Sequence, residues 1–330
     1  MNVAGLSIYW VAAHLISTGS LEIGQLVAFM DYLFHAMFSI MLFCTVFMMY
    51  PRAEVSAKRI EEVFNLDPII KNKPADSDFD EKVSIEFDHV TFVYPDGEEP
   101  VLQDVSFKAN KGEMIAFIGS TGSGKSTLVN LVPRFYDVSS GSIKINGKDI
   151  RDYDVLELRD KLGVIPQKAV LFSGTIADNI RFGKKDASDE EVEYAAKVAQ
   201  AYPFIMEKEN GFDEEISEGA TNVSGGQKQR LSIARALVRK AQIYIFDDSF
   251  SALDFKTDAI LRKELKKEMT ESIMLVVAQR ISSIMEADQI IVLNEGKVVG
   301  KGTHHQLLKE CQIYHEIATS QLSEEELANA

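Results

Sequence analysis

The chain has 330 residues, a formal net charge of −15 and a hydrophobic fraction of 46%. This length allows two or more domains. The acidic balance argues against a nucleic-acid partner, because the chain has no surplus of basic residues to neutralise phosphates. Its two cysteines, Cys44 and Cys311, have no metal-binding spacing, and we expect no structural disulfide between them.

Residues 1–50 are apolar and predict a partial transmembrane domain. They contain no lysine or arginine, and nearly every charge of the chain follows them. Residues 1–16 are a little short for a bilayer span, which takes about 20 residues. Residues 17–24 are rich in turn-forming residues and predict a loop. Residues 25–50 are long enough to span a bilayer with some tilt.

Basic residues set the predicted orientation. Arg52, Lys58 and Arg59 follow the second apolar stretch, whereas the loop before it carries only Glu22. The positive-inside bias therefore places the chain from residue 52 onward in the cytoplasm and the loop outside. A signal peptide fits poorly, because no basic region precedes the two apolar stretches. The alternative is a buried helical hairpin of a soluble protein.

Two ionisable residues interrupt the second apolar stretch. Asp31 and His35 are four residues apart and should share one face of a helix. They either face a cavity or a partner within the membrane, or lie near the outer interface in contact with water.

Residues 51–82 predict a connecting helix and a linker. An amphipathic pattern continues the helix to about Asn65, and the following residues are polar and include Pro68 and Pro74. From Val83 the composition is that of a soluble α/β domain. We place this domain at residues 83–319 and a solvated acidic tail at residues 320–330.

Several short patterns predict elements of the α/β domain. Residues 84–90 alternate like a half-buried strand. Asn146 and Gly147 form the dipeptide that favours a tight hairpin turn. Ser188 and Glu191 have the spacing of a helix capping box. Two unbroken apolar runs, at residues 242–246 and 273–277, indicate strands buried on both faces of a parallel sheet.

A glycine-rich stretch lies between a short apolar strand, residues 114–118, and a predicted helix, residues 128–132. It reads Gly119-Ser120-Thr121-Gly122-Ser123-Gly124-Lys125-Ser126-Thr127 and fits the phosphate-binding loop pattern. Its glycines let the backbone approach closely, and the helix N-terminus adds partial positive charge. We expect Lys125 to reach the β- and γ-phosphates of ATP and Ser126 to bind Mg²⁺. A chance glycine-rich turn is the alternative.

Three further stretches carry candidate site residues. Asp247 and Asp248 end the strand at residues 242–246, where Asp247 would hold Mg²⁺ directly or through water. Gln167 lies at the end of another predicted strand and would complete the metal shell. A second anion site is predicted where a helix opens with Ser224, Gly225, Gly226 and Gln227. Because one ATP does not need two such loops in one domain, the second loop is expected to cap a nucleotide bound by another subunit.

Residues 83–319 resemble the nucleotide-binding domain of an ABC transporter. The phosphate loop, Gln167, the Ser224 signature, the Asp247 strand and Ser251-Ala-Leu-Asp254 follow that family's order and spacing. Tyr94 stands where the family stacks an aromatic ring on adenine. The resemblance implies an α/β P-loop NTPase fold, with a RecA-like parallel sheet core, an antiparallel β subdomain and a helical subdomain, preceded by two transmembrane α-helices. It also implies ATP and Mg²⁺ as cofactors and contact of Asp254 across a dimer.

The N-terminal part resembles the end of an exporter transmembrane domain. Residues 19–29 are similar to the segment that opens its last helix, so residues 1–16 would end the fifth helix and residues 25–50 would form the sixth. In this family, two nucleotide-binding domains pair head to tail, and each ATP lies between one phosphate loop and the other signature. The resemblance implies an ATP-hydrolysing exporter subunit in the plasma membrane with an unknown substrate. Because such domains carry six helices, Met1 is expected to start a fragment or to be a misassigned start.

Three positions differ from the family pattern. Asp248 replaces a glutamate that polarises the attacking water, which sets its carboxylate back by about 1.5 Å and can cost on the order of a hundredfold in rate. Gln279 replaces a switch histidine and can bind the γ-phosphate but cannot take up positive charge. Val223 replaces a leucine, a change expected to matter little. Together, Asp248 and Gln279 predict a slow site in a heterodimer whose partner carries the glutamate and the histidine. Lys125, the third catalytic candidate, matches the family pattern and would hold the phosphates.

Three other functions fit parts of the sequence. A symmetric homodimer of slow ATPases would carry the same two substitutions in both sites. A soluble ABC-type ATPase of translation or chromosome upkeep is disfavoured by the apolar residues 25–50. A regulator that binds ATP without turnover is compatible with the composition.

Overall fold

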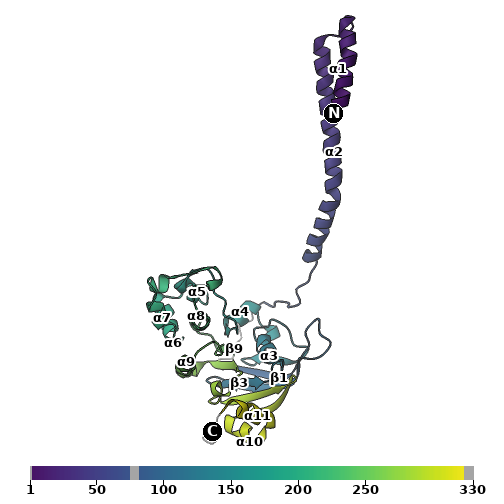
Figure 1. Cartoon of the computed structure of the whole chain (residues 1–330). Coiled ribbons are helices and arrows are strands. Elements are labelled where there is room, and N and C mark those ends of the chain that lie inside the picture. Colours follow the sequence, from purple (N-terminus) through teal and green to yellow (C-terminus); the bar gives the residue numbers. More distant parts are fainter. Residues whose placement is uncertain (1, 75–81, 323–330) are drawn as a thin grey trace. The chain divides into compact units, whose positions relative to one another are not determined.

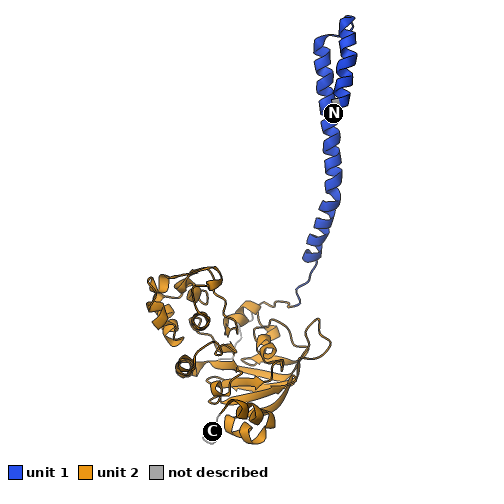
Figure 2. Cartoon of the chain, viewed as in Figure 1, with its two compact units in different colours: residues 1–69 blue, residues 70–330 orange. Residues whose placement is uncertain are grey.

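The computed structural model describes residues 2–74 and 82–322, which divide into two compact units (Figures 1 and 2). The first unit is Met1–Ile69 and the second is Ile70–Ala330. Most of the predicted linker after Pro74, and the acidic tail from Ser323 onward, lie outside the described residues.

The first unit is a helical hairpin of α1 (Asn2–Ser17) and α2 (Ile23–Phe64). The turn between them is shorter than predicted, because α2 begins at Ile23, where Oε1 of Gln25 accepts the N–H of Glu22 at 3.0 Å. The helix then continues through Pro51, as the amphipathic pattern after the apolar stretch predicts. Proline lacks an N–H and removes one bond of the helix ladder, yet α2 extends to Phe64.

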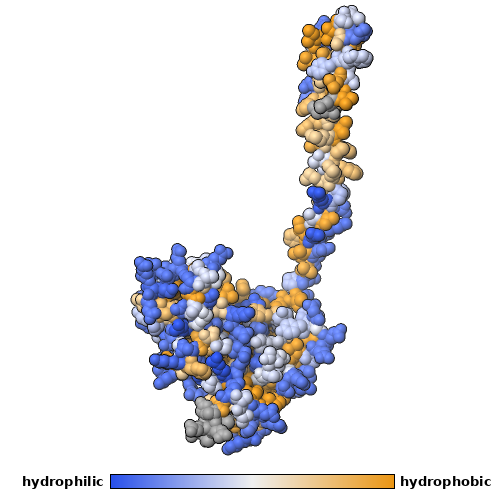
Figure 3. Space-filling view, viewed as in Figure 1, coloured by the Kyte–Doolittle hydropathy of each residue, from blue (hydrophilic) through white to orange (hydrophobic). Residues whose placement is uncertain are grey.

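Many exposed side chains of α1 and of the part of α2 before Pro51 are apolar (Figure 3). None of the residues of α2 is buried, and by length and composition this helix can cross a membrane. Helix α1 is also apolar but has only 16 residues. Within α2, Nε2 of His35 lies 3.6 Å from Oδ2 of Asp31, so the two residues share a face as their spacing predicts.

The described part of the second unit contains two large sheets and one small one. The antiparallel sheet has the order β2-β1-β4-β5, formed by β1 (Ser84–Phe92), β2 (Leu102–Asn110), β4 (Ser140–Ile145) and β5 (Lys148–Asp149). The larger sheet has the order β12-β11-β3-β10-β9-β6, formed by β3 (Met114–Gly119), β6 (Leu162–Ile165), β9 (Ile243–Asp247), β10 (Ile273–Val277), β11 (Gln289–Asn294) and β12 (Lys297–Gly302). All of its pairs are parallel except that of β11 with the edge strand β12. The small sheet pairs β7 (Gly174–Thr175) with β8 (Glu215–Ile216).

Helices surround these sheets (Figure 1). They are α3 (Lys125–Leu131), α4 (Val155–Asp160), α5 (Ile176–Arg181), α6 (Asp189–Val198), α7 (Tyr202–Met206), α8 (Gly225–Leu237), α9 (Phe255–Glu268), α10 (His304–Glu310) and α11 (Gln312–Gln321). Helices α5 to α8 form the predicted helical subdomain. The mostly parallel core, the antiparallel sheet and this helical part confirm the predicted fold class.

The local sequence patterns correspond to these elements. Asn146 and Gly147 turn between β4 and β5 with φ of 53° and 77°, both in the left-handed region that an Asn-Gly turn tolerates. Ser188 caps α6, because its hydroxyl oxygen accepts the N–H of Glu191 at 3.3 Å. Every residue of β10 is buried, which explains its unbroken apolar sequence.

The central sheet has a hydrophobic cluster on each face. In β9, Ile243 and Ile245 belong to the cluster shared with the antiparallel sheet, whereas Tyr244 and Phe246 belong to the cluster shared with the helical subdomain. This alternation follows from the pleat of a strand. Packing on both faces fixes the parallel strands, so their carboxyl ends and the loops that follow meet at one edge.

The second unit begins before its first strand, because the preceding segment is hydrogen-bonded to it. Nδ2 of Asn72 donates to Oδ2 of Asp154 at 2.7 Å. The guanidinium of buried Arg134 donates to the carbonyl oxygen of Lys71 at 3.3 Å. The segment before Pro74 is therefore part of the α/β unit.

Candidate functional site

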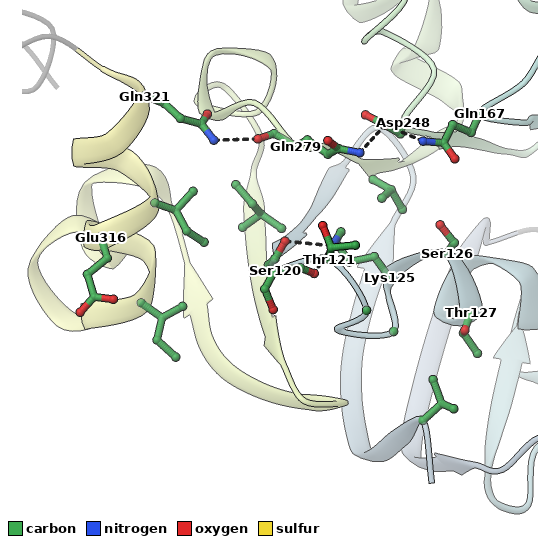
Figure 4. A pocket seen from close by; sticks show the side chains of 18 of the residues that line it. Ser120, Thr121, Lys125, Ser126, Thr127, Gln167, Asp248, Gln279, Glu316 and Gln321 are labelled. Carbon is green, nitrogen blue, oxygen red and sulfur yellow. Dashed lines mark hydrogen bonds between the residues drawn. The ribbon is translucent and has the colours of Figure 1, made fainter. Parts of the chain in front are cut away.

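A cavity of about 850 Å³ lies at the carboxyl edge of the parallel strands (Figure 4). Val277 at the end of β10 is in register with Asp247 at the end of β9 and with Phe117 near the end of β3. The loops after these strands therefore open at the same place. The cavity wall contains most of the glycine-rich loop together with Gln167, Asp248 and Gln279, and its far side is formed by α11.

The glycine-rich loop is folded so tightly that its glycines cannot be replaced freely. A Cβ on Gly119 would lie 2.0 Å from the carbonyl oxygen of Leu293. Gly124 has a φ of 95°, and a Cβ there would lie 2.8 Å from a methyl group of Leu102. Close backbone approach and a left-handed conformation are therefore required at these two positions.

Lys125 begins α3 and folds back over the loop. Its Nζ donates to the carbonyl oxygens of Gly119 at 2.9 Å and Ser120 at 2.7 Å, and to Oγ of Ser123 at 3.3 Å. Burial lowers the pKa of Lys125, and the nearby carboxylates of Asp248 and Asp247 oppose this shift. The ammonium group of Lys125 is thus held next to the backbone of a loop that can bind phosphate.

Ser126 and Asp247 offer two oxygen atoms suited to a hard cation. Oγ of Ser126 donates to Oδ1 of Asp247 at 2.8 Å. Burial raises the pKa of Asp247, and the hydrogen bond from Ser126 opposes that rise. Mg²⁺ prefers such oxygen ligands and commonly takes its remaining ligands from phosphate and water, so these residues fit the cation that the sequence predicts.

Asp248 joins three loops of the site. Its Oδ2 accepts hydrogen bonds from Nε2 of Gln167 at 3.0 Å and from Nε2 of Gln279 at 2.7 Å (Figure 4). It is only 7% exposed, and burial raises the pKa of its carboxyl, a shift that the bond from Gln167 opposes. The structure therefore brings together Gln167, Asp248 and Gln279, as the sequence predicts.

Tyr94 lies beside the glycine-rich loop and outside the cavity wall. Its hydroxyl is 3.0 Å from Oγ1 of Thr127, and its ring meets Phe92 and Tyr136 edge-on, at centroid distances of 4.8 and 5.2 Å. The remaining loop residues, Thr121 and Gly122, line the cavity itself.

The second predicted anion site is separate from the cavity. Ser224 caps α8: its Oγ accepts the N–H of Gln227 at 3.3 Å, and Oε1 of Gln227 accepts the N–H of Ser224 at 2.9 Å. Gly225 has open space around it, and neither it nor Gly226 lines the cavity. The structure thus does not unite Ser224–Gln227 with the glycine-rich loop of the same chain.

Helix α8 is linked to the loop that carries Gln167, and Asp254 caps α9. Nε2 of buried Gln229 in α8 donates to the carbonyl oxygen of Pro166, next to Gln167, at 3.1 Å. Asp254 caps α9 by accepting the N–H of Thr257 at 3.0 Å, and this backbone hydrogen bond lowers the pKa of its carboxyl.

The sequence did not predict the contribution of α11, which lines the cavity with Ile313, Glu316, Ile317, Ser320 and Gln321. Gln321 of α11 hydrogen-bonds to the backbone of Gln279, which precedes it by 42 residues. Its sequence neighbourhood contains no motif that would have indicated this contact.

The fold and the site define a P-loop nucleotide-binding domain of the ABC type. Residues 102–251 match the family model described as ABC transporter. This part of the chain is therefore similar to the ABC transporter family, as the sequence motifs indicate.

The relatives of the chain are ABC transporter ATP-binding proteins. It is 42% identical over 327 residues to the uncharacterized ABC transporter ATP-binding protein YfiB of Bacillus subtilis, covering 98% of this chain and 56% of the relative. It is 39% identical over 321 residues to a putative multidrug export ATP-binding/permease protein of Staphylococcus aureus, covering 97% of this chain and 56% of the relative. The chain thus spans about half the length of the curated relatives it matches.

A solved structure is similar along the same extent. The chain superposes on a bacterial Atm1-family ABC exporter with ATP bound, with a TM-score of 0.85 and 32% sequence identity. The match covers 98% of this chain and 57% of the exporter chain. The similarity therefore includes the N-terminal helices as well as the α/β domain.

Proposed function

We propose that this chain is an ATP-binding and ATP-hydrolysing subunit of an ABC exporter. In this function, ATP-driven closure of two nucleotide-binding domains is coupled to export of a substrate across a membrane. The main support for this proposal is that Ser224–Gln227 lie outside the cavity. Each domain would then supply one half of each of two ATP sites, and a second domain would supply the other halves. The exporter names of the staphylococcal relative and of the similar structure support the direction of transport.

The residues of the cavity have complementary roles in this proposal. Lys125 and the loop N–H groups bind the phosphates, and Tyr94 stacks on adenine. Ser126, Asp247 and Oε1 of Gln167 hold Mg²⁺, which neutralises phosphate charge when bound. Catalysis of phosphoryl transfer consists mainly of such positioning and charge stabilisation.

A second domain completes each site. A twofold, head-to-tail pairing brings the signature of one domain to the phosphate loop of the other, because an isologous interface exchanges the same two patches. Ser224–Gln227 would then close on the partner's ATP, with their backbone N–H groups directed at its phosphates. Asp254, at the start of α9, would contact the partner across the interface.

We propose that hydrolysis in this chain's own site is slow. Asp248 has a short side chain that is held by two amides, and Gln279 cannot become positively charged. A non-identical partner with a glutamate and a histidine at these positions would explain why this chain has two altered catalytic positions but an intact signature. The signature would serve the partner's ATP site, where hydrolysis is fast. In the alternative, a symmetric homodimer, both sites would be slow.

The apolar helices anchor the chain in a membrane in this proposal. Helices α1 and α2 would be the last two helices of an exporter transmembrane domain, and Arg52, Lys58 and Arg59 place the ATPase domain in the cytoplasm under the plasma membrane. Detergent-free extraction into the soluble fraction would instead favour a soluble ABC-type ATPase.

Turnover measured with and without a partner tests the proposal. Purified chain should bind Mg-ATP but hydrolyse it slowly, and addition of the partner half-transporter should produce fast hydrolysis that depends on both subunits. Fast hydrolysis by a monomer that gains nothing from any second subunit would contradict it. Binding without turnover in every assembly would indicate a regulator.

A further inference from the structure

Gln321, the last residue of α11, holds both sides of the loop that carries Gln279. Its Nε2 donates to the carbonyl oxygen of Gln279 at 2.8 Å, and its Oε1 accepts the N–H of Ile281 at 2.9 Å. Figure 4 shows the first of these bonds reaching from α11 to the backbone of the loop after β10. One amide group therefore fixes two backbone groups, on the two sides of Arg280.

The helix that carries Gln321 is firmly packed. Tyr314 and Ala318 of α11 are fully buried and belong to the same hydrophobic cluster as Ile281. The hydroxyl of Tyr314 also lies 2.7 Å from Nδ1 of His304 in a buried contact. Gln321 thus extends from an anchored helix, and its two hydrogen bonds transmit that rigidity to the loop.

The loop that it holds ends in the catalytic cavity. On its other side, the Gln279 side chain donates from Nε2 to Oδ2 of Asp248 at 2.7 Å. The backbone of Gln279 is therefore held by α11, while its side chain is held by Asp248, the residue after β9. A shift of this backbone by a fraction of an ångström would move the amide relative to Asp248 and to any nucleotide in the cavity.

We propose that Gln321 is a positioning residue for ATP hydrolysis. By fixing the backbone on both sides of Arg280, it aims the Gln279 amide at Asp248 and, with ATP bound, at the γ-phosphate. This inference rests on the proposed ATPase function. It makes the C-terminal helix a part of the hydrolytic apparatus, although Gln321 itself acts only through Gln279.

The rival role is a purely structural one, in which Gln321 only ends α11 and stabilises its packing. A structural residue would lower stability and nucleotide affinity together. A positioning residue would lower turnover while Mg-ATP affinity changes little, because both side-chain hydrogen bonds of Gln321 go to the loop after β10 rather than to Lys125 or the phosphate loop. It would also lose its effect once Gln279 is removed.

Two variants of Gln321 separate its two hydrogen bonds in the full chain, purified with the partner that completes its sites. Gln321→Ala removes both bonds. Gln321→Glu keeps an acceptor for the N–H of Ile281 but loses the donor to Gln279. Gln312→Ala is the matched control, because Gln312 lies on the same helix, is exposed and bonds to Glu316 of that helix at 2.9 Å.

Turnover at this chain's site, with the partner site disabled, should fall about fivefold to tenfold in Gln321→Ala. The Kd for Mg-ATP should stay within about twofold of the wild type, and Gln312→Ala should change neither quantity. In a Gln279→Ala background, Gln321→Ala should have an additional effect of less than about twofold. The inference would be overturned if Gln321→Ala lowered affinity and turnover equally. It would also be overturned if the effects of Gln321→Ala and Gln279→Ala on turnover were fully additive.

Amide hydrogen exchange tests the contact without relying on hydrolysis. The N–H of Ile281 should exchange about tenfold faster in Gln321→Ala and at the wild-type rate in Gln321→Glu. Unchanged exchange in Gln321→Ala would overturn the inference even if turnover falls. If the wild-type assembly hydrolyses no ATP, the proposed function fails, and the exchange result still decides whether Gln321 holds this loop.

Discussion

Gln279 donates a hydrogen bond from Nε2 to Oδ2 of Asp248 at 2.7 Å, joining the loop after β10 to the end of β9. The resemblance to ABC ATPases leads us to expect a glutamate and a histidine at these two positions, and the two residues contact each other directly. Neither substitution can therefore be judged alone, because a longer acid at 248 would meet the residue at 279.

The double substitution Asp248→Glu with Gln279→His should raise turnover at this site. The longer acid reaches the attacking water, and the imidazole supplies a group that can carry charge. We expect a gain of about tenfold to a hundredfold, with less from either single change. Hydrolysis is to be measured in the assembly with the other site disabled, and no gain there would refute the slow-site proposal.

Removal of the loop ammonium should weaken nucleotide binding. Lys125→Ala deletes three hydrogen bonds to the loop together with the positive charge. Because charge-assisted hydrogen bonds are the strong ones, we expect Mg-ATP affinity to fall by about tenfold or more in calorimetric titration. Lys108→Ala, on the surface of the antiparallel sheet, is the control and should bind normally; an equal loss in both variants would exclude a specific role for Lys125.

Arg235 should be a major source of stability in the helical subdomain. Its guanidinium donates to the backbone and side chain of Asn179 at 2.9 Å and to the carbonyl oxygen of Val170 at 2.8 Å, and lies over the rings of Phe172 and Phe182. Arg235→Met should lower the free energy of unfolding by about 2–4 kcal/mol, because buried acceptors lose their donors.

Arg239→Met is the matched control for that measurement. Arg239 pairs with the exposed carboxylate of Asp160, and such surface pairs contribute about 0–1 kcal/mol. Denaturant unfolding of both variants should therefore show a large loss for Arg235 and a small one for Arg239. Similar losses of unfolding free energy in both variants would show that the hydrogen bonds around Asn179 add little to stability.

Stability should decrease in mildly acidic solution because of His304. Burial lowers the pKa of His304 below its usual 6.5, and the residue is 3% exposed beside Tyr314. As the pH falls through 6.5, the unfolded chain takes up a proton on this residue before the folded domain does, so stability present above pH 6.5 is lost below it. The free energy of unfolding should therefore fall more steeply from about pH 7.5 to 5.5 in the wild type than in His304→Gln. If the free energy of unfolding fell equally with pH in the wild type and in His304→Gln, His304 would not be the cause of the loss.

The sequence predicted the elements whose signals are local. The buried runs that became β9 and β10, the capping box at Ser188 and the Asn146 turn are each encoded within a few residues, so spacing and residue type were sufficient. The unbroken course of α2 through Pro51 also followed from its apolar and amphipathic pattern. The short turn before Ile23 was not predicted, because it depends on the cap formed by Gln25.

Contacts across long sequence separations were only partly predictable. The resemblance to the family assigned Gln167, Asp248 and Gln279 to one ATP site, but it did not predict that both amides would donate to one carboxylate oxygen. The role of Gln321 was not predictable, because packing of α11 rather than a motif brings it to Gln279. The assignment of individual residues to ATP and Mg²⁺ remains a proposal.

The claim that two chains share each ATP site is tested most directly by blocking the signature. Ser224→Trp, in an assembly of this chain with its partner, should reduce hydrolysis at the partner's site by at least about a hundredfold. Mg-ATP affinity at this chain's own loop should stay within about twofold. Ser188→Trp, which disrupts a similar cap in the same subdomain, should leave the partner's hydrolysis unchanged. Full hydrolysis at the partner's site in Ser224→Trp would contradict the account.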